Sequence, residues 1–548
     1  MSATILMIVS IIILFIGYIF YGRFLSRSLG VDPNRNTPAY TKEDGVDYVP
    51  TKKAVLLGHH FSSIAGAGPI LGPIYAAMFG WIPVFLWILV GSIFVGGVHD
   101  FSSLIASIRH GGKTIGEVIE DHIGKAGKKL FLIFTWSVLV LVIAVFAKAV
   151  ASVFVKEPAT VTSSGLFIIL AILFGISMYR YKISLWLNSV IGIVLLLGCV
   201  VLGVYFPIVQ SYNFWVVILF IYIFIAAVTP VWILLQPRDY LNSFLLYLIL
   251  IGGVIGIIFA NPQISFPAFT GFQTDLGYLF PILFVTVACG AISGFHSLVS
   301  AGTTAKQLNK ETDAKPIGYG SMLIEAVLAV VALITAITII QSDYNELIKA
   351  EGGGPIGIFS AGVGGFISKL GIPIEAAITF AALAISAFAL TTLDTATRLG
   401  RFAFQEFFES KEKQTMLSNN RYIGTLVTVV VAMLLTFSGT SNTLWPLFGS
   451  ANQLLASLAL LAITVWLAEL QKNNNFVKYP MYFMFLVTLT ALGFLIHKNF
   501  ITKNIPLVIL SILLFGIAVV LVVEANKGLK RIAAHAENNE VPKQTVNV

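Results

Sequence analysis

Residues 57–73 read LGHHFSSIAGAGPILGP, and apolar sequence continues from them to Met78. Glycine and proline loosen or remove the backbone hydrogen bonds of a helix, which is costly in a bilayer core that contains no water. Such a break is tolerated at membrane depth only where protein surrounds it or where it lines an aqueous cavity. We therefore interpret residues 65–69 as an unwound segment of a membrane helix, placed at a binding site.

The composition of the whole chain places this stretch in a membrane protein. Hydrophobic residues make up 57% of the 548 residues, charged residues only 11%, and the mean hydropathy is +0.90. Soluble domains carry about 25% charged residues. The composition therefore excludes a soluble globular protein and predicts an all-α polytopic membrane protein.

Apolar segments long enough to cross a bilayer recur along the chain. A helix needs about 20 residues to cross roughly 30 Å of hydrocarbon, and on that criterion we expect about 15 spans. They are predicted at residues 4–22, 54–79, 82–108, 130–152, 162–179, 183–206, 214–235, 242–260, 279–303, 317–340, 372–397, 421–438, 442–468, 479–496 and 505–523. The first segment lacks a basic start and a cleavage pattern, which favours a retained helix over a signal peptide.

The basic residues indicate the orientation of the chain in the lipid bilayer. The formal net charge is +8, and most of the 34 Lys and Arg residues fall in alternate loops if the spans cross strictly in and out. Basic loops stay in the cytoplasm, so we expect the N-terminus outside and the C-terminus inside. The positive charge is thus a topology signal and gives no argument for nucleic acid.

A second interrupted stretch predicts an internal repeat. TPVWILLQPRDYL, residues 229–241, contains Pro230 and Pro237 and lies five spans after the first break, in a span that crosses in the opposite direction. Discontinuous helices in inverted orientation are typical of transporters with a five-plus-five inverted-repeat core; the alternative is that the prolines merely kink two ordinary helices. The expected organisation is an N-terminal helix and loop at 1–53, a transport core at 54–408 with halves at about 54–206 and 214–397, peripheral helices at 409–523 and a cytoplasmic tail at 524–548.

The first break has the chemistry of an anion site. Unwinding exposes backbone groups, and the half-helix that follows presents the positive end of its dipole to the cavity. A substrate carboxylate fits that end. The expected substrate-binding residues are Ser62, Ser63, Gly66, Gly68 and Pro69 at the break, with Trp232 and Gln236 facing them from the seventh span.

Histidines inside the spans form a second group, at similar depth on three helices. Its members are His59, His60, His99, Asp100 and His296. Histidine changes charge near neutral pH, so a proton relay is one interpretation, with Asp100 orienting or sharing the proton. The alternatives are structural hydrogen bonds and a metal site. The spacing lacks the i, i+4 histidine pair of helical metal motifs, and we expect no metal and no cofactor.

Hydroxyl groups and one acid extend this group. Ser300, Thr303 and Thr304 follow His296 and offer oxygen ligands to sodium, or else they serve as packing residues between helices. Glu325 lies deep in the tenth span and is the expected protonatable carboxylate. The coupling ion is therefore either H⁺ or Na⁺.

Three further features concern access to the site. Lys148, near the outer end of the fourth span, either extends to the surface or faces the cavity as a counter-charge for a carboxylate. Asp394 and Arg398 stand at i, i+4 and can pair as an inner gate, although the arginine also suits a topology anchor. The outer segment 341–371 is either a surface helix that gates an outer cavity or a plain loop.

The stretch GHHFSSIAGAGPILGP resembles the signature of the carbon starvation protein family, the CstA-like transporters. Four later blocks resemble that family in the same order. They are VGGVHDFSSLIASIRHGGKTIGEVI at 95–119, ACGAISGFHSLVSAGTTAKQL at 288–308, LDTATRLGRFAFQE at 393–406 and LWPLFGSANQLLASLAL at 444–460. The resemblance implies a bacterial inner (plasma) membrane transporter related to the amino acid–polyamine–organocation superfamily, in a chain that looks short for the family.

The resemblance also implies a function. Family members are associated with peptide uptake under nutrient limitation, and relatives are pyruvate–proton symporters. We expect a secondary active transporter that imports peptides under carbon starvation, or alternatively a proton-coupled symporter of pyruvate or another small carboxylate. A membrane metalloprotein and a nutrient sensor are further alternatives. The chain has no G-x-x-x-x-G-K-[ST] loop, which argues against ATP-driven pumping; we expect no enzyme, and the oligomeric state is left open.

Overall fold

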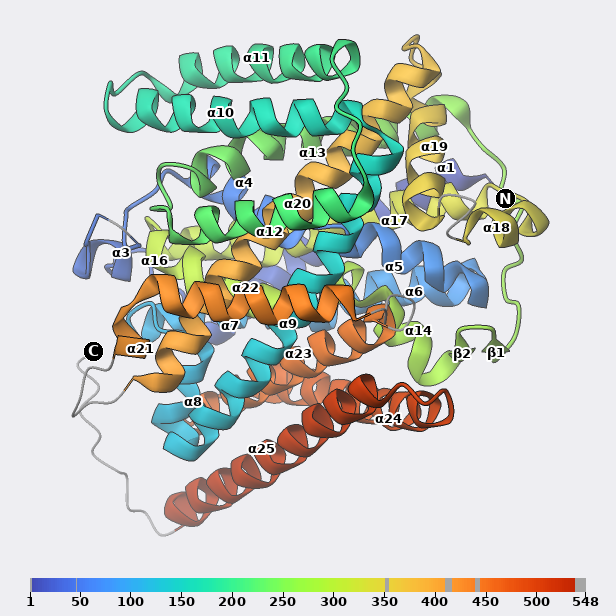
Figure 1. The fold of residues 1–548 in the computed structure, drawn as a ribbon. Helices are drawn as coiled ribbons and strands as arrows, with labels where there is room; N and C mark the ends of the chain where they lie inside the picture. The colour runs from blue at the N-terminus through green and yellow to red at the C-terminus, as the bar shows by residue number, and fades with distance from the viewer. Residues whose placement is uncertain (1, 46, 350–353, 410–415, 439–443, 538–548) are drawn as a thin grey trace.

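The structure is a computed structural model that describes residues 2–45, 47–349, 354–409, 416–438 and 444–537 (Figure 1). Its α-helices are α1 Ala3–Ile16, α2 Gly22–Leu29, α3 Pro38–Thr41, α4 Lys53–Ile64, α5 Gly68–Ala76, α6 Trp81–Gly91, α7 Gly97–Arg109, α8 Ile115–Ile123, α9 Lys125–Lys156, α10 Ala159–Tyr179, α11 Leu185–Tyr205, α12 Tyr212–Val228, α13 Leu235–Ala260, α14 Leu279–Val287, α15 Gly294–Val299, α16 Ala305–Gln307, α17 Ser321–Ile337, α18 Gln341–Leu347, α19 Gly354–Ser368, α20 Ile374–Phe408, α21 Met416–Asn419, α22 Arg421–Phe437, α23 Leu444–Glu469, α24 Asn475–Ile501 and α25 Ile505–Glu537. Short 3-10 and π segments are η1 Gly17–Tyr21, η2 Ala77–Phe79, η3 Ser92–Gly96, η4 Ala288–Gly290, η5 Ser300–Thr304, η6 Glu311–Asp313 and η7 Lys315–Gly320, and a small antiparallel hairpin joins β1 Gln273–Thr274 to β2 Gly277–Tyr278.

Helices cover every span predicted from the sequence. In the described part of the chain, 12 helices are long and apolar enough to cross a membrane, or up to 13 if the bent pair α4–α5 is one span. Two shorter apolar helices, α12 and α22, occupy the predicted spans at 214–235 and 421–438. The all-α polytopic fold with about 15 spans is therefore confirmed.

The first break lies where the sequence predicts it. Helix α4 ends at Ile64, the chain leaves helical geometry at Ala65 (φ −77°, ψ 58°), and α5 begins at Gly68 after a bend of 42°. Glycine is required here because neighbouring helices come very close. A Cβ at Gly66 would lie 2.4 Å from Thr392 Oγ1, and one at Gly68 would lie 2.5 Å from Cys289 Sγ.

The second break lies elsewhere than predicted, so the expectation at Pro230 and Pro237 is wrong. Residues 229–234 connect two separate helices, α12 and α13, and Pro237 sits in the first turn of α13, where proline costs little. The discontinuous helix is instead α14–α15, interrupted at Ala288–Ser293, within the small-residue stretch ACGAISG.

Asn452 of α23 stabilises this second break. Its Oδ1 accepts a hydrogen bond from the backbone N–H of Phe295 at 2.8 Å, and its Nδ2 donates to Ser293 Oγ at 2.9 Å. The side chain thereby caps the start of α15, whose first N–H groups have no partner within the helix. Asn452 therefore serves as a structural hydrogen-bonding group between α23 and the second break.

The two broken helices face each other in the centre of the molecule. Gly68 approaches Cys289, and a Cβ at Gly72 would lie 2.6 Å from the carbonyl oxygen of Thr286. The long helices α9 and α20 pack along each other beside them. We propose that the repeats begin with α4–α5 and with α14–α15, so that the halves are about 53–260 and 279–469, in place of the predicted 54–206 and 214–397.

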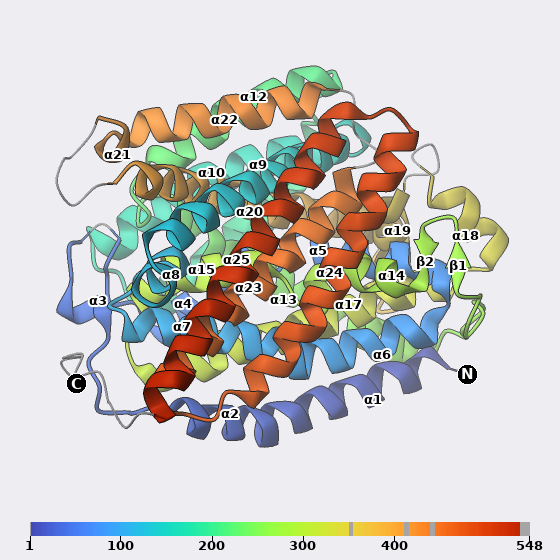
Figure 2. The same cartoon turned by 90° about the horizontal axis from the view of Figure 1, so that it is seen from below.

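Three helical pairs lie outside these proposed halves or interrupt them. The hairpin α10–α11 is inserted after α9 and lies at the edge of the molecule (Figure 1). Helices α1 and α2 lie along one side, and α24 and α25 cross another face (Figure 2). Many large apolar side chains of α1, α11 and α25 are exposed, as expected for helices in contact with lipid.

The predicted outer segment contains two helices. Of residues 341–371, the part outside the described residues is 350–353; α18 and α19 form the rest. Helix α19 packs against α20, α13, α17 and α5. It therefore lies over the ends of core helices, which agrees with the interpretation as a helix that covers an outer cavity.

Candidate functional site

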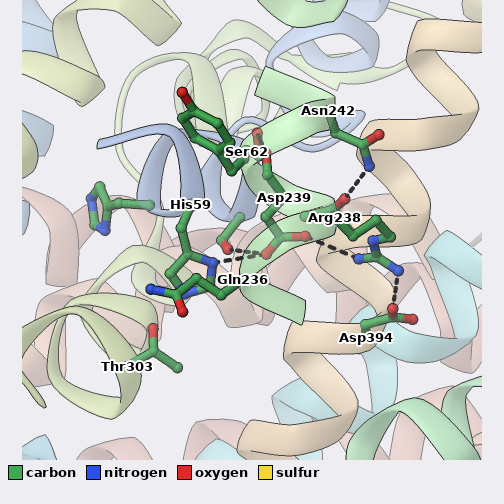
Figure 3. Close-up of polar contacts among 12 residues, drawn as sticks. His59, Ser62, Gln236, Arg238, Asp239, Asn242, Thr303 and Asp394 are labelled. Carbon is green, nitrogen blue, oxygen red and sulfur yellow. Dashed lines mark hydrogen bonds and ion pairs between the residues drawn. The ribbon is translucent and has the colours of Figure 1, made fainter. Parts of the chain in front are cut away.

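A buried polar network joins the first broken helix to α13. His59 Nδ1 lies 2.9 Å from Asp239 Oδ2, Ser63 Oγ donates to the same oxygen at 3.3 Å, and Ser62 Oγ donates to the Asp239 backbone carbonyl at 2.9 Å (Figure 3). All these side chains are fully buried. The hydroxyls that were predicted to bind substrate are thus engaged with Asp239 in this structure.

Arg238 extends the network to α20 and α12. Its guanidinium donates to Asp239 Oδ1 at 3.1 Å and, from its other end, to Asp394 Oδ2 (Figure 3). The same end also donates to the Tyr222 hydroxyl. Tyr222 itself donates to Asp394 Oδ2 at 2.7 Å. We call Arg238, Asp239, Asp394, Tyr222 and His59 the arginine cluster.

The expected pair between Asp394 and Arg398 does not form within the described residues. Asp394 pairs with Arg238 instead, and Arg398 donates to the backbone carbonyls of Ala226 and Thr229 at the end of α12. The reason is position: Arg238 comes from a facing helix and can reach both Asp239 and Asp394, whereas Arg398 meets the free carbonyls of a helix end. The predicted gate partner is therefore corrected to Arg238.

A second buried network runs through α7, α15 and α17. His99 Nδ1 lies 2.7 Å from Asp100 Oδ1, and Asp100 Oδ2 lies 2.8 Å from His296 Nδ1. The other nitrogen of His296, Nε2, lies 3.5 Å from Glu325 Oε2. We call these four fully buried side chains the histidine chain. The sequence predicted each member, and the structure brings all four together.

Several polar atoms of the histidine chain have no hydrogen-bond partner in the described part of the molecule. Neither carboxylate oxygen of Glu325 makes a hydrogen bond, nor do His296 Nε2 and His99 Nε2. Buried polar groups are normally paired, and an unpaired one needs an explanation. A proton shared between His296 and Glu325 would satisfy both, which is chemistry that this geometry permits.

The remaining predicted ion-coupling residues are His60 of α4 and the three hydroxyl residues of η5, and most of them form hydrogen bonds within the protein. His60 Nδ1 lies 2.8 Å from Thr304 Oγ1, which ties α4 to η5. Thr303 donates within its own helix to the Val299 carbonyl at 2.9 Å. Ser300 Oγ has no partner among the described residues. Two of the three hydroxyls are thus engaged in hydrogen bonds in this structure, and their role as sodium ligands stays a prediction.

Two residues predicted at the break lie elsewhere. Gln236 donates to Thr51 Oγ1 and to Gln307 Oε1, each at 3.0 Å, at the start of α4 and far from its broken end. The Trp232 carbonyl lies against α10, 3.0 Å from where a Cβ of Gly175 would be. The α13 residues that reach toward the break are instead Asp239 and Asn242, because α13 begins only after the connecting segment.

A cavity of about 500 Å³ opens on the side that is predicted to be extracellular. Helices α5, α9, α19 and α20 line it, and we call it the outer cavity. Leu71, one helical turn beyond Gly68, contributes to its wall, so the cavity reaches close to the start of α5. Aromatic side chains in the wall are Tyr75, Tyr212 and Trp445.

Charged groups of both signs line the outer cavity. Lys148 is one of them, so of its two predicted roles the structure favours the one that faces the cavity. Lys156 and Glu157, at the end of α9, are two more, and partial burial raises the pKa of the Glu157 carboxyl. Neither Lys148 nor Glu157 forms an ion pair within the described residues. The sequence analysis did not single out Glu157.

Metal binding finds no support in the described geometry. Across those residues, no group of three or more His, Cys, Asp and Glu side chains is arranged to hold a metal ion. Each of the histidines in the two networks directs Nδ1 to a carboxylate or hydroxyl oxygen.

The chain matches one family model and several curated proteins. The family is "Carbon starvation protein CstA", matched over residues 2–353 and 345–491. A peptide transporter CstA of Campylobacter jejuni is 35% identical over 86% of this chain and 77% of its own, and that of Bacillus subtilis is 33% identical over 91% of both. A pyruvate/proton symporter, BtsT of Escherichia coli, is 31% identical over 90% of this chain and 81% of its own.

Solved structures share the fold at low sequence identity. A manganese transporter of Eremococcus coleocola, in complex with an aromatic bis-isothiourea substituted compound, matches with a TM-score of 0.52 and 14% identity, over 89% of this chain and 99% of that one. MhsT in complex with L-phenylalanine matches with a TM-score of 0.50 and 12% identity, over 86% and 99%. These likenesses support the discontinuous-helix transporter fold.

Proposed function

The chain belongs to the CstA family of carbon starvation proteins, and from this premise we propose that it imports short peptides by ion-coupled alternating access. The observation that carries the proposal is the outer cavity, which bears two lysines and a carboxylate and ends one turn from a broken helix. The peptide transporters of C. jejuni and B. subtilis support the substrate class. The protein would be a multi-pass protein of the bacterial inner membrane, with its N-terminus outside, and not an enzyme.

The dimensions of the cavity suit a short peptide. Binding pockets of small molecules typically measure about 300–1,000 Å³, and this cavity measures about 500 Å³. Lys148 lies eight positions before the end of α9 at Lys156, or roughly 12 Å at 1.5 Å per residue, and Glu157 is the residue that follows this end. An extended peptide covers about 3.5 Å per residue. With their side chains extended toward each other, these two groups would bind the carboxylate and the ammonium of a di- to tetrapeptide.

A second candidate substrate is pyruvate or another small carboxylate. Similarity to the E. coli pyruvate/proton symporter favours it. Such a substrate would use Lys148 and then the positive end of α5, which begins at Gly68 and Pro69. Ser62, Ser63 and Gly66 would be exposed to it only after the contacts with Asp239 rearrange. Pyruvate has no ammonium group, so Glu157 would contribute nothing to its binding.

Proton coupling is the form of coupling that the buried networks support. The histidine chain combines two acids and two histidines without any buried lysine or arginine among its members. With both acids ionised it would carry two buried negative charges, which are costly unless protons compensate them. We propose that Glu325 and His296 hold the transported proton and that His99 and Asp100 orient His296. The proton symporter among the relatives supports H⁺ over Na⁺.

The arginine cluster serves as the gate in this proposal. It joins α4, which carries the broken end, to α13, α20 and α12. Gln236, Thr51 and Gln307 close the same side of the molecule near the start of α4. Because the cavity opens on the other side, which is predicted to be extracellular, we interpret the structure as an outward-facing state. Opening to the cytoplasm would separate His59 from Asp239 and Arg238 from Asp394.

Uptake by the full-length protein in proteoliposomes tests the substrate class. Labelled dipeptide and labelled pyruvate are compared in the wild type, Glu157→Gln and Lys148→Gln, with exposed residues of the same side, Glu375→Gln and Lys369→Gln, as controls. A charged hydrogen bond contributes about 1.5–3 kcal/mol. Glu157→Gln should therefore raise KM for the dipeptide about tenfold or more, whereas Lys148→Gln should impair any substrate that carries a carboxylate.

The outcomes separate the two substrates. Peptide import is supported if the wild type takes up the dipeptide, Glu157→Gln weakens this uptake, and the control variants leave it intact. Saturable uptake of pyruvate alone, unaffected by Glu157→Gln, contradicts it and supports the small carboxylate. An N-acetylated dipeptide offers a second check, since it lacks the ammonium group and should compete poorly with the free dipeptide.

A further inference from the structure

A groove of about 460 Å³ lies at the predicted cytoplasmic end of the first helix, far in the fold from the transport site. Three basic residues line it: Arg23 and Arg27 of α2 and Lys315 of η7. Its other lining residues are Ser26, Gly30, Val31 and Thr312, so no carboxylate faces it. We call it the basic groove. Within the described residues, none of the three cations forms an ion pair with an acid.

The fold holds these like charges together. Gly22 lets η7 come close to the first helix, because a Cβ there would lie 3.0 Å from Lys315 Cε. Lys315 Nζ lies 4.5 Å from the centre of the Tyr18 ring. Arg23 and Arg27 stand four residues apart and so share one face of α2. Three positive charges on one groove repel one another, and an anion would relieve that repulsion.

The nearby acid does not neutralise the groove. Glu311 accepts from Arg109 at 2.5 and 2.9 Å and from the backbone N–H of Asp32 at 3.2 Å, and its side chain is fully buried. Arg35 lies 4.0 Å from the same carboxylate. The negative charge of Glu311 is therefore already shared between two other arginines.

The position of the groove indicates what kind of anion it takes. Phe20 and Phe24 stand on the same face as Arg23 and Arg27 and are 68% and 44% exposed. The apolar part of this helix, residues 4–22, is about 30 Å long and matches the hydrocarbon core. We therefore expect the two phenylalanines to face acyl chains. The basic residues then begin at the level of the headgroups, which carry negative charge in the cytoplasmic leaflet.

We propose that the basic groove binds the headgroup of an anionic phospholipid, with its acyl chains along Phe20 and Phe24. The phosphate accepts hydrogen bonds from Arg23 and Arg27, for which arginine is well suited, and Lys315 adds a point charge. The lipid thereby links the first helix to η7, the segment that leads into α17 and Glu325. This site is independent of the transported substrate.

Thermal unfolding of the purified full-length protein tests the proposal. Three proteins are compared: the wild type, the groove variant Arg23→Gln/Arg27→Gln/Lys315→Gln, and a matched control, Lys125→Gln/Lys129→Gln/Arg421→Gln, which removes three basic charges elsewhere. Each protein receives, in separate experiments, phosphatidylglycerol from vesicles, phosphatidylcholine from vesicles, or free glycerol phosphate. Phosphatidylglycerol should raise Tm of the wild type and of the control, and the groove variant should lose most of that shift. An equal shift in all three proteins overturns the proposal.

Two further results would also overturn it. A shift of the same size with glycerol phosphate would assign the groove to a soluble anion, and one with phosphatidylcholine would show an effect without headgroup selectivity. If the triple variant fails to fold, Arg27→Gln alone and native mass spectrometry of the wild type replace it. Retention of phosphatidylglycerol over phosphatidylcholine on the wild type is then the expected result, and equal retention contradicts it.

Discussion

At the scale of single residues, the unusual feature is the amount of charge buried among apolar helices. Arg238, Asp239 and Asp394 are each almost completely buried, and the ion pairs among them link α13 to α20. Ionisable groups inside a membrane protein are costly and are usually functional. Removing one partner of a buried ion pair also destabilises the protein strongly, because the other charge is then buried without a partner.

This asymmetry gives a prediction for the gate. Arg238→Met and Asp394→Asn should each lower the free energy of unfolding by about 3–5 kcal/mol, because each leaves buried charge uncompensated. The double variant should lose clearly less than the sum, since the two residues share one interaction. Unfolding in mixed detergent micelles measures this, with exposed Arg421→Met as the control. Strictly additive losses would contradict the pairing.

Glu325 gives a second prediction at this scale. Glu325→Gln keeps the shape of the side chain and removes its ability to release a proton. We expect substrate exchange across the membrane to continue, because exchange needs no net proton transfer, whereas accumulation driven by a pH gradient should be lost. Counterflow and gradient-driven uptake measure the two. Wild-type accumulation in this variant would rule out Glu325 as the proton carrier.

The sequence allowed the prediction of the histidine chain and of two members of the arginine cluster, His59 and Asp394. It missed the other three, Arg238, Asp239 and Tyr222. His99, Asp100, His296 and Glu325 each stand deep inside a predicted span, where a polar residue is conspicuous. Arg238 and Asp239 follow two prolines near a predicted span end, so they were assigned to a cytoplasmic loop. The signal that could have found them is the adjacency of opposite charges between two long apolar segments, 214–235 and 242–260.

At the scale of elements, the broken helix α4–α5 organises the site. His59 and His60 are adjacent on it and therefore point about 100° apart, to different partners. His59 meets Asp239 of α13, and His60 meets Thr304 of η5. One helix thus contacts the arginine cluster on one side and the region of the histidine chain on the other.

The close packing at the break is testable with one methyl group. Gly66→Ala would place a Cβ 2.4 Å from Thr392 Oγ1, so something must shift. We expect a clear loss of transport and lower thermal stability, with part of both restored by adding Thr392→Ala. Gly165→Ala in α10 is the matched control, since no atom lies within 4 Å of its added Cβ. Normal transport by Gly66→Ala would refute the tight packing at the break.

The second broken helix shows where sequence reasoning fails at this scale. Two prolines at 230 and 237 predicted a break, yet proline is well tolerated in a connection and in a first helical turn. The true break, ACGAISG at 288–294, contains no proline and depends on small residues and on the Asn452 cap from α23. That cap comes from more than 150 positions away in the chain, and local sequence carries no sign of it.

At the scale of the whole molecule, the two networks differ in what they connect. The histidine chain joins α7, α15 and α17, and of these α15 and α17 pack against α4. The arginine cluster joins α4 to α12, α13 and α20 instead. If one group of helices rocks against the other, as in related folds, the first network moves as a unit and the second separates.

Proton movement on addition of substrate tests the central claim of proton-coupled import most directly. Proteoliposomes with a trapped pH dye and no imposed gradient receive external dipeptide. The account predicts acidification of the interior that accompanies uptake of labelled dipeptide, needs no sodium and is absent in Glu325→Gln. Uptake of the dipeptide without acidification, or with a strict requirement for sodium, would contradict it.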